Sequence, residues 1–171
     1  MRRAAYVCAV VSCLIIPVGA AACTADGLPA LSDQVILSID GQIALNTADQ
    51  GAAFDLAMLQ AMEQTTFQTS TIWTEGPQTF TGVSLHTLLD CLGATGTVIA
   101  ASALNDYTIE IPVSDAVEGG PILAYEVNGK PLSVREKGPL WIVYPYDSSS
   151  AYQSEVIYAR SIWQVARMQV R

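Results

Sequence analysis

The stretch FTGVSLHTLL, residues 80–89, changes from mixed polar and apolar residues to a leucine-rich pattern at Ser84. Serine is a favoured N-cap, and Gly93 lies where a helix of two turns would end. The leucines that follow recur at helical spacing on one face, at positions 85, 88, 89 and 92. The sequence therefore predicts a short amphipathic helix, preceded by a turn and by Trp73 among hydroxyl residues.

Further along the chain, alternating apolar and polar residues predict several strands. The Asp-Gly pair that closes the first of them predicts a hairpin turn. A longer segment, Ala52–Gln64, has apolar residues at 54, 56, 59 and 62 and predicts a second amphipathic helix. The predicted strands are 35–41, 107–111, 122–127, 141–144 and 162–170. This order predicts one α+β domain, a single mixed domain richer in strand than in helix.

The first 22 residues have the plan of a secretory signal peptide. Arg2 and Arg3 precede an apolar run, and small residues follow at 19–22. We expect residues 1–22 to be removed and residues 23–171 to form the domain in the periplasm. The general secretory route carries unfolded chains, so a ligand would be acquired after export.

Two cysteines remain after this cleavage, Cys23 and Cys91. Cys23 lies at the expected cleavage point, so lipid anchoring is an alternative, but Ala20 is a poor match to the leucine of a lipobox. A disulfide between the two cysteines is chemically possible in an oxidising compartment. The interpretation we favour for Cys91 is a buried helix cysteine.

The charge of the chain excludes nucleic-acid binding. Its formal net charge is −8, and loss of Arg2 and Arg3 leaves six basic residues against sixteen acidic ones. Nucleic-acid phosphates need clustered lysine and arginine, and the sequence has no basic run.

Few residues offer conventional catalytic chemistry. His86 is the only histidine, and its helix position predicts an exposed side chain rather than a catalytic base or zinc ligand. No phosphate-binding glycine loop is present. What remains is a set of aromatic residues beside small polar ones, which suits a flat, hydrogen-bonding heterocycle, or alternatively an ordinary aromatic core.

Four motifs in order resemble the sulfite-oxidase-type molybdopterin-binding domain. They are FTGVSLHTLL (80–89), NDYTIEIP (105–112), ILAYEVNGKPL (122–132) and KGPLWIVYP (137–145). The resemblance covers about two thirds of the chain and implies that fold.

Three departures from the family pattern bear on the cofactor. The family's molybdenum-ligating cysteine would fall at Ser70 or Thr71, and no cysteine lies between Cys23 and Cys91. Trp141 stands where the family has an arginine, and the loop 146–155 lacks the glycine and lysine pattern that holds the cofactor's phosphate. A thiolate ties the metal and basic residues offset phosphate charge, so the changes favour a smaller, neutral ligand.

The segments TIWTEG (71–76) and REKGPLW (135–141) are similar to a branch of small periplasmic proteins that lack this cysteine. The resemblance implies binding of a reduced pterin of the tetrahydropterin type, without metal or molybdenum cofactor. It also implies signalling to the periplasmic domain of a membrane-bound diguanylate cyclase or phosphodiesterase, an enzyme of cyclic-di-GMP turnover. Alternatives are a molybdenum-cofactor oxidoreductase of the sulfite oxidase type using Ser70 or Thr71, and a ligand-free adaptor.

We predict binding roles but no catalytic residues and no metal ligands. The absence of the family's molybdenum-ligating cysteine favours a protein that is not an enzyme. Trp73 would stack on the pterin or wall the pocket, hydroxyls would bond its edge, and a carboxylate would accept from its amino and N3 groups. Arg135 and Lys137 would orient the pyrimidine carbonyl or pair with acids. The predicted set is Ser70, Thr71, Trp73, Thr74, Glu75, Asp106, Tyr107, Arg135, Lys137, Trp141, Tyr144 and Asp147.

Overall fold

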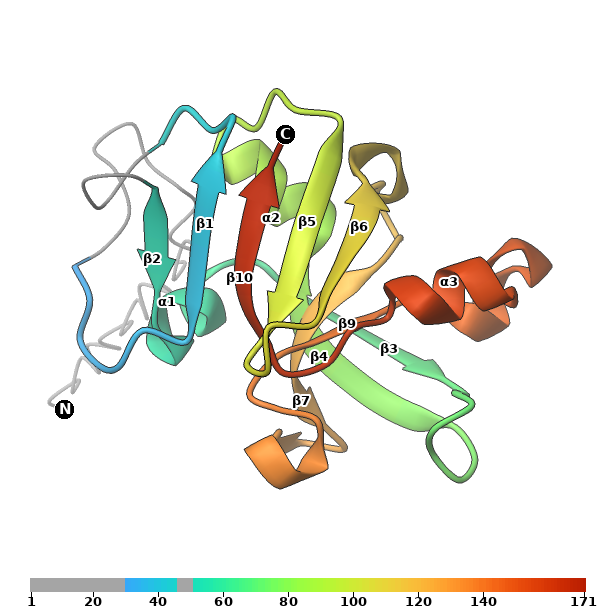
Figure 1. Cartoon of the computed structure of the whole chain (residues 1–171). Helices are drawn as coiled ribbons and strands as arrows, with labels where there is room; N and C mark the ends of the chain where they lie inside the picture. Colours follow the sequence, from blue (N-terminus) through green and yellow to red (C-terminus); the bar gives the residue numbers. More distant parts are fainter. Residues whose placement is uncertain (1–29, 46–50) are drawn as a thin grey trace, which may run out of the picture.

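The computed structural model describes residues 30–45 and 51–171. Within them two five-stranded sheets stand side by side, and few helices cover them (Figure 1). The α+β, strand-rich prediction is therefore confirmed. The signal-peptide prediction for residues 1–22 and the assignments at Cys23 lie outside the described residues.

The first sheet has the order β2-β1-β10-β5-β6 and is mixed, because β1 pairs with β10 in parallel while its other pairs are antiparallel. In Figure 1 the C-terminal strand lies between β1 and β5, with α2 behind it. The strands are β1 (Leu37–Gly41), β2 (Ala52–Phe54), β5 (Val98–Ala103), β6 (Thr108–Pro112) and β10 (Val165–Val170).

The second sheet is antiparallel, with the order β3-β4-β7-β8 and with β9 paired to β7. Gly82 lies at an irregularity where β4 meets β7, and a Cβ there would collide with the carbonyl oxygen of Leu123. The glycine of the GVSL motif is thus required by close backbone approach. The strands are β3 (Gln64–Thr69), β4 (Gln78–Ser84), β7 (Ile122–Val127), β8 (Lys130–Pro131) and β9 (Trp141–Val143).

Short helices link these strands: α1 (Leu56–Ala61), α2 (Leu85–Cys91), α3 (Glu155–Arg160) and the 3₁₀ turns η1 (Val113–Asp115), η2 (Val134–Glu136), η3 (Tyr146–Ser148) and η4 (Ser150–Tyr152). The α2 prediction is confirmed, since the Ser84 hydroxyl accepts a hydrogen bond from the His86 N–H at 3.2 Å. Leu85 and Leu88 are fully buried on its inner face. None of the helices in the described part of the chain is long and apolar enough to cross a membrane.

The predicted helix over 52–64 is wrong in its extent. Residues 52–54 form β2, which pairs with β1, and β3 begins at Gln64. Asp55 separates strand from helix, because its buried carboxylate accepts the Met58 N–H at 2.8 Å and so caps α1. The strands pair as the Asp40-Gly41 turn predicts, but residues 42–51 connect them rather than a two-residue turn.

The two sheets meet where the chain approaches β10. Trp163 forms an isolated antiparallel bridge with Trp141 of β9. The Ile142 N–H donates to the Ile162 carbonyl at 2.9 Å, and the Val165 N–H donates to the Leu140 carbonyl at 3.0 Å. The segment just before β10 therefore joins the sheets, and the candidate site lies at this junction.

Candidate functional site

The loop between β3 and β4 carries Trp73, and its polar groups hold it in place. The Ser70 N–H donates to the Asp147 carboxylate at 2.6 Å, and the Asp147 N–H donates to the Thr69 hydroxyl at 3.0 Å. The Thr71 hydroxyl accepts the Trp73 N–H at 3.1 Å and lies 2.8 Å from the Thr74 hydroxyl. These bonds fix the loop against η3 and orient the indole.

Trp73 lies at the centre of an aromatic cluster. Its ring centroid is 5.7 Å from that of Trp163, 5.8 Å from that of Trp141 and 5.9 Å from that of Tyr158, all in edge-to-face geometry. Tyr146 packs at 6.4 Å in the same geometry. Edge-to-face packing of this kind contributes about 0.5–1.5 kcal/mol per pair beyond area burial. The cluster forms a wall built from three separate segments of the chain.

Beside this wall lies a cavity of about 340 Å³, which we call the aromatic cavity. Its rim is open, since Tyr107 is 55% exposed and Trp163 is 38% exposed. It is lined by Trp73, Ala103, Asn105, Tyr107, Tyr158, Ala159, Ser161, Ile162, Trp163 and Gln164. The combination of aromatic walls with a few polar groups is typical of a small-molecule site.

Two amide side chains supply hydrogen-bonding groups to this cavity. The Asn105 Oδ1 accepts the Tyr107 N–H at 3.2 Å, and the Gln164 Nε2 donates to the Val134 carbonyl at 2.8 Å. Within the described residues, the Asn105 Nδ2 and the Gln164 Oε1 take part in no other hydrogen bond. One amide thus offers a donor and the other an acceptor to a ligand.

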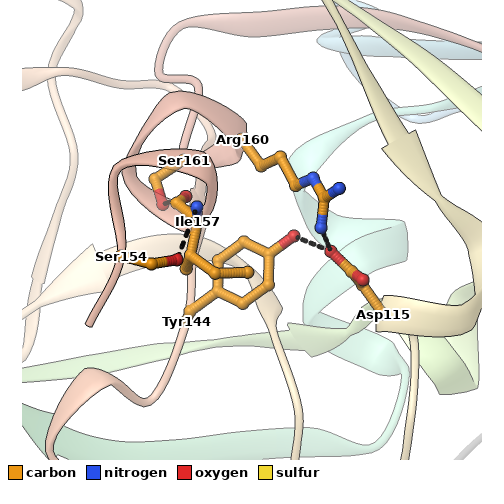
Figure 2. Close-up of polar contacts among 6 residues, drawn as sticks. All are labelled: Asp115, Tyr144, Ser154, Ile157, Arg160 and Ser161. Atoms are coloured by element: carbon orange, nitrogen blue, oxygen red, sulfur yellow. Dashed lines mark hydrogen bonds and ion pairs between the residues drawn. The ribbon is translucent and has the colours of Figure 1, made fainter. Parts of the chain in front are cut away.

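The cavity wall after α3 is held by a cluster around Asp115 (Figure 2). The Asp115 carboxylate accepts from the Tyr144 hydroxyl at 2.8 Å and from Arg160 at 2.9 Å. Burial, followed by the bond to this carboxylate, raises the pKa of Tyr144. Because Arg160 ends α3 immediately before Ser161, these contacts fix the segment that carries Trp163 and Gln164.

Tyr146 anchors the same segment from inside the core. Its hydroxyl donates to the Ser161 hydroxyl at 2.6 Å, and the Ser161 hydroxyl donates to the Ile157 carbonyl at 2.8 Å. Burial raises the pKa of Tyr146 to about 12, although the Ser161 bond opposes the shift. The Ser161 hydroxyl is therefore hydrogen-bonded within the protein, and the residue forms part of the cavity wall.

Lys137 also contacts the aromatic cluster. Its ammonium lies 5.5 Å from the ring centroid of Trp141 and 5.7 Å from that of Trp163, within the range of cation–π attraction. Its backbone has a φ of 73°, and its carbonyl accepts the Gln164 N–H at 3.0 Å. Lys137 thus stabilises the wall, and it does not line the aromatic cavity.

The structure places two of the twelve predicted residues, Trp73 and Tyr107, in the cavity lining. The hydroxyls of Thr71 and Thr74, the Ser70 amide and Asp147 are used to hold the loop. Trp141 is buried behind Trp73 and donates its indole N–H to the Ser161 carbonyl at 3.2 Å.

The remaining predicted residues are not among those that line the cavity. Asp106 is exposed and paired with Arg167, and Tyr144 is buried in the core against Asp115. Glu75 and Arg135 are exposed on their loops. The carboxylates expected to bind the ligand are therefore not part of this cavity, and the amides of Asn105 and Gln164 take their place.

Comparison with known proteins identifies the fold family. The model of the oxidoreductase molybdopterin binding domain matches residues 35–148. The chain belongs to this family. The prediction from the four motifs is confirmed, since this is the sulfite-oxidase-type molybdopterin-binding domain.

A solved structure agrees with this assignment. The sulfane dehydrogenase SoxCD from Paracoccus pantotrophus is 20% identical to this molybdopterin-binding domain, with a TM-score of 0.60 over 84% of the chain. The match spans 40% of the SoxCD chain, and at this identity it shows the fold alone. Comparison with curated proteins gave no match.

The residues of the aromatic cavity do not fit a molybdenum cofactor. A thiolate would be needed to tie the metal, and lysine or arginine to offset phosphate charge. The lining, taken over the described residues, contains no cysteine, lysine or arginine. No cluster of three or more potential metal ligands occurs in the described ranges either.

Proposed function

We propose that this domain binds a reduced pterin without metal in the aromatic cavity and acts as a periplasmic ligand sensor. The observation that carries the proposal is a family fold whose candidate cavity is lined by aromatic rings and amides, without a thiol or cation. Such a lining suits the flat, neutral head of the family's cofactor rather than its metal and phosphate.

Ring stacking would supply most of the affinity. Trp163 and Tyr107 both line the cavity and are partly exposed, so a flat ligand can bury apolar area against them. The volume of about 340 Å³ lies near the lower end of the range for small-molecule sites, which suits a bicyclic ring. Trp73, which also lines the cavity, contacts Trp163 edge to face.

Hydrogen bonds would set the specificity. A pterin presents amino and N3 donors next to a carbonyl acceptor. The Gln164 Oε1 can accept from the donors, and the Asn105 Nδ2 can donate to the carbonyl. A site built to satisfy such an edge discriminates against heterocycles that lack it, because its own polar groups would then be left unpaired.

Signalling is the finer part of the proposal, and it rests on the resemblance to cysteine-less periplasmic relatives. The partner would be the periplasmic domain of a membrane-bound enzyme of cyclic-di-GMP turnover. The ligand would alter the exposed rim at Tyr107 and Trp163, where a partner can contact it.

Anaerobic calorimetric titration of residues 23–171 with tetrahydropterin and with its oxidised form tests the binding. We expect one site per chain with micromolar or tighter affinity for the reduced form. Trp163→Ala should weaken binding by about 10- to 100-fold, the range for loss of one stacking ring. Ile72→Ala is the matched control, since Ile72 is 62% exposed and lies outside the lining.

Absence of heat with every pterin, in protein shown to be folded, would contradict the proposal. Equal weakening by both variants would place the ligand elsewhere. Full-strength binding by Trp163→Ala would likewise exclude this cavity.

A further inference from the structure

A second cavity lies beside α2 and shares no lining residue with the aromatic cavity. Its volume is about 600 Å³, and it extends from Met62 at the end of α1, past the start of β3, to α2 and Gly119. Three carboxylates line it, those of Glu63, Asp90 and Glu118. Its described lining has no lysine or arginine, so we call it the acidic groove.

Cys91 lies in this groove and is disulfide-bonded. Cys91 ends α2 but is only half-buried and is disulfide-bonded, so the interpretation as a buried helix cysteine in preference to a disulfide is wrong. The chain has three other cysteines, Cys8, Cys13 and Cys23, all outside the described residues. Removal of the predicted signal peptide, residues 1–22, leaves Cys23 as the single partner available within the chain.

We propose that the acidic groove is the seat of the chain's own mature N-terminus, fastened there by a Cys23–Cys91 disulfide. The occupant is the segment 23–29, which begins at the predicted cleavage point. This inference does not depend on pterin binding, because it concerns a different part of the domain.

The lengths of chain agree with this placement. The Ser32 N–H donates to the Asp55 carboxylate at 2.7 Å, which fixes the incoming chain at the start of α1. From there α1, with six residues, covers about 9 Å to the groove at Met62. The nine residues back from Ser32 to Cys23 can span at most about 30 Å, so Cys23 can reach Cys91.

Charge favours the same occupant. Cleavage before Cys23 creates an α-ammonium on that residue. A disulfide holds its two Cα atoms within about 7 Å of each other, so the ammonium would lie next to Cys91 and its neighbour Asp90. The groove's carboxylates, Glu63 and Glu118 included, would then gain the cation that their lining lacks.

The bond has a further consequence for localisation. Its formation removes one proton and one electron from each thiol, and a protein disulfide of the oxidising compartment accepts both electrons by thiol–disulfide exchange. A sulfur used in this way cannot carry a thioether-linked lipid. Disulfide formation and lipid anchoring at Cys23 are therefore alternatives, and the proposed bond predicts the unanchored form.

The test uses the full chain expressed with its own leader in an exporting bacterial host and purified without reductant. We expect peptide mapping by mass spectrometry to show a peptide that starts at Cys23 joined to the peptide containing Cys91, and no lipid. Two reactive thiols, a lipidated Cys23, or a Cys91–Cys91 bond between two copies would each overturn the proposal.

A second measurement tests the seat itself. Titration in a glutathione redox buffer should show that the Glu63→Gln, Asp90→Asn double variant is reduced about two- to fivefold more easily, because the N-terminal ammonium loses its partners. Glu75→Gln is the control, since this carboxylate is exposed in another loop. An unchanged midpoint in the double variant would show that the N-terminus does not sit in the groove.

Pterin titration of Cys91→Ser separates this inference from the proposed function. The aromatic cavity shares no residue with the groove, so we expect its affinity to change less than twofold. Loss of the disulfide together with loss of pterin binding would show that the two cavities are coupled and would overturn the separation.

Discussion

The aromatic cavity and the acidic groove lie on one small domain but differ in the chemistry of the residues that line them. The first is walled by indole and phenol rings with two amides, and its lining has no charged residue in the described chain. The second is lined by three carboxylates and a disulfide-bonded cysteine. The difference shows that the junction of the two sheets holds an uncharged cavity, while the disulfide-bonded cysteine lies in a separate, acidic part of the domain.

Cys91→Ser should produce the largest loss of stability if the comparison is correct. A Cys23–Cys91 bond closes a loop of about 70 residues, which in the chain-entropy model stabilises the fold by about 4 kcal/mol. We expect the melting temperature measured by circular dichroism to fall by roughly 10 °C. A fall of the same size after adding reductant to the unaltered protein, with no further fall in the variant, would assign the effect to the disulfide.

Asp115→Asn should have the next largest effect and should act on the aromatic side. Its carboxylate accepts both the buried Tyr144 hydroxyl and Arg160, and hydrogen bonds to charged groups contribute about 2 kcal/mol. We expect that loss in denaturant unfolding, together with severalfold weaker pterin binding, because the segment with Trp163 follows α3.

Asp106→Asn is the matched control for Asp115→Asn. Asp106 also pairs with an arginine, but both partners are exposed, so its contribution should be under about 1 kcal/mol. Equal losses in the two variants would mean that the cluster in Figure 2 does not support the cavity wall.

Asn105→Ala should weaken pterin binding by about fivefold while leaving stability nearly unchanged. The side chain is exposed and offers one hydrogen bond to the ligand, and a single such bond is worth about 1 kcal/mol. Calorimetric titration beside the adjacent Asp106→Asn variant checks it. Stronger weakening by Asp106→Asn would restore the predicted carboxylate and remove the amide from the site.

How much of this could be read from the sequence depends on how local each feature is. The helix α2 follows from Ser84 and four leucines within ten residues, and the family follows from four motifs in order. The segment 52–64 has helical spacing of apolar residues, yet pairing of β2 with β1 and the Asp55 cap divide it. Strand β5, VIAASA, was not predicted because small alanines give no alternation.

The site was only partly predictable for the same reason. Trp73 was found because hydroxyl residues surround it, and Tyr107 because it begins an alternating strand. Trp163 and Gln164 belong to a segment distant from both, and the bridge to Trp141 brings them to the cavity. The left-handed backbone of Gln164, with a φ of 56°, gave no sequence signal because glutamine rarely adopts it.

The last prediction is a pH dependence at Asp55, whose carboxylate accepts hydrogen bonds from Ser32 and Asp33 of the incoming chain. Hydrogen bonds from the N–H groups of Met58, Ser32 and Asp33, with one from the Ser32 hydroxyl, lower its pKa from 3.8 to about 2 against the opposing effect of burial.

A carboxyl whose folded pKa is depressed stabilises the fold above its unfolded pKa and loses that contribution as the pH falls through the folded pKa. The melting temperatures of the unaltered protein and of Asp55→Asn should therefore differ by a constant amount above about pH 5 and converge between about pH 4 and pH 2. Asp33→Asn, which alters an exposed carboxylate beside the same chain segment, is the matched control. If the Asp55→Asn difference instead persisted to pH 2, the loss of stability would come from the poor fit of the amide and not from the lost charge. The ionised carboxylate would then not be the group that fixes the entering chain at α1.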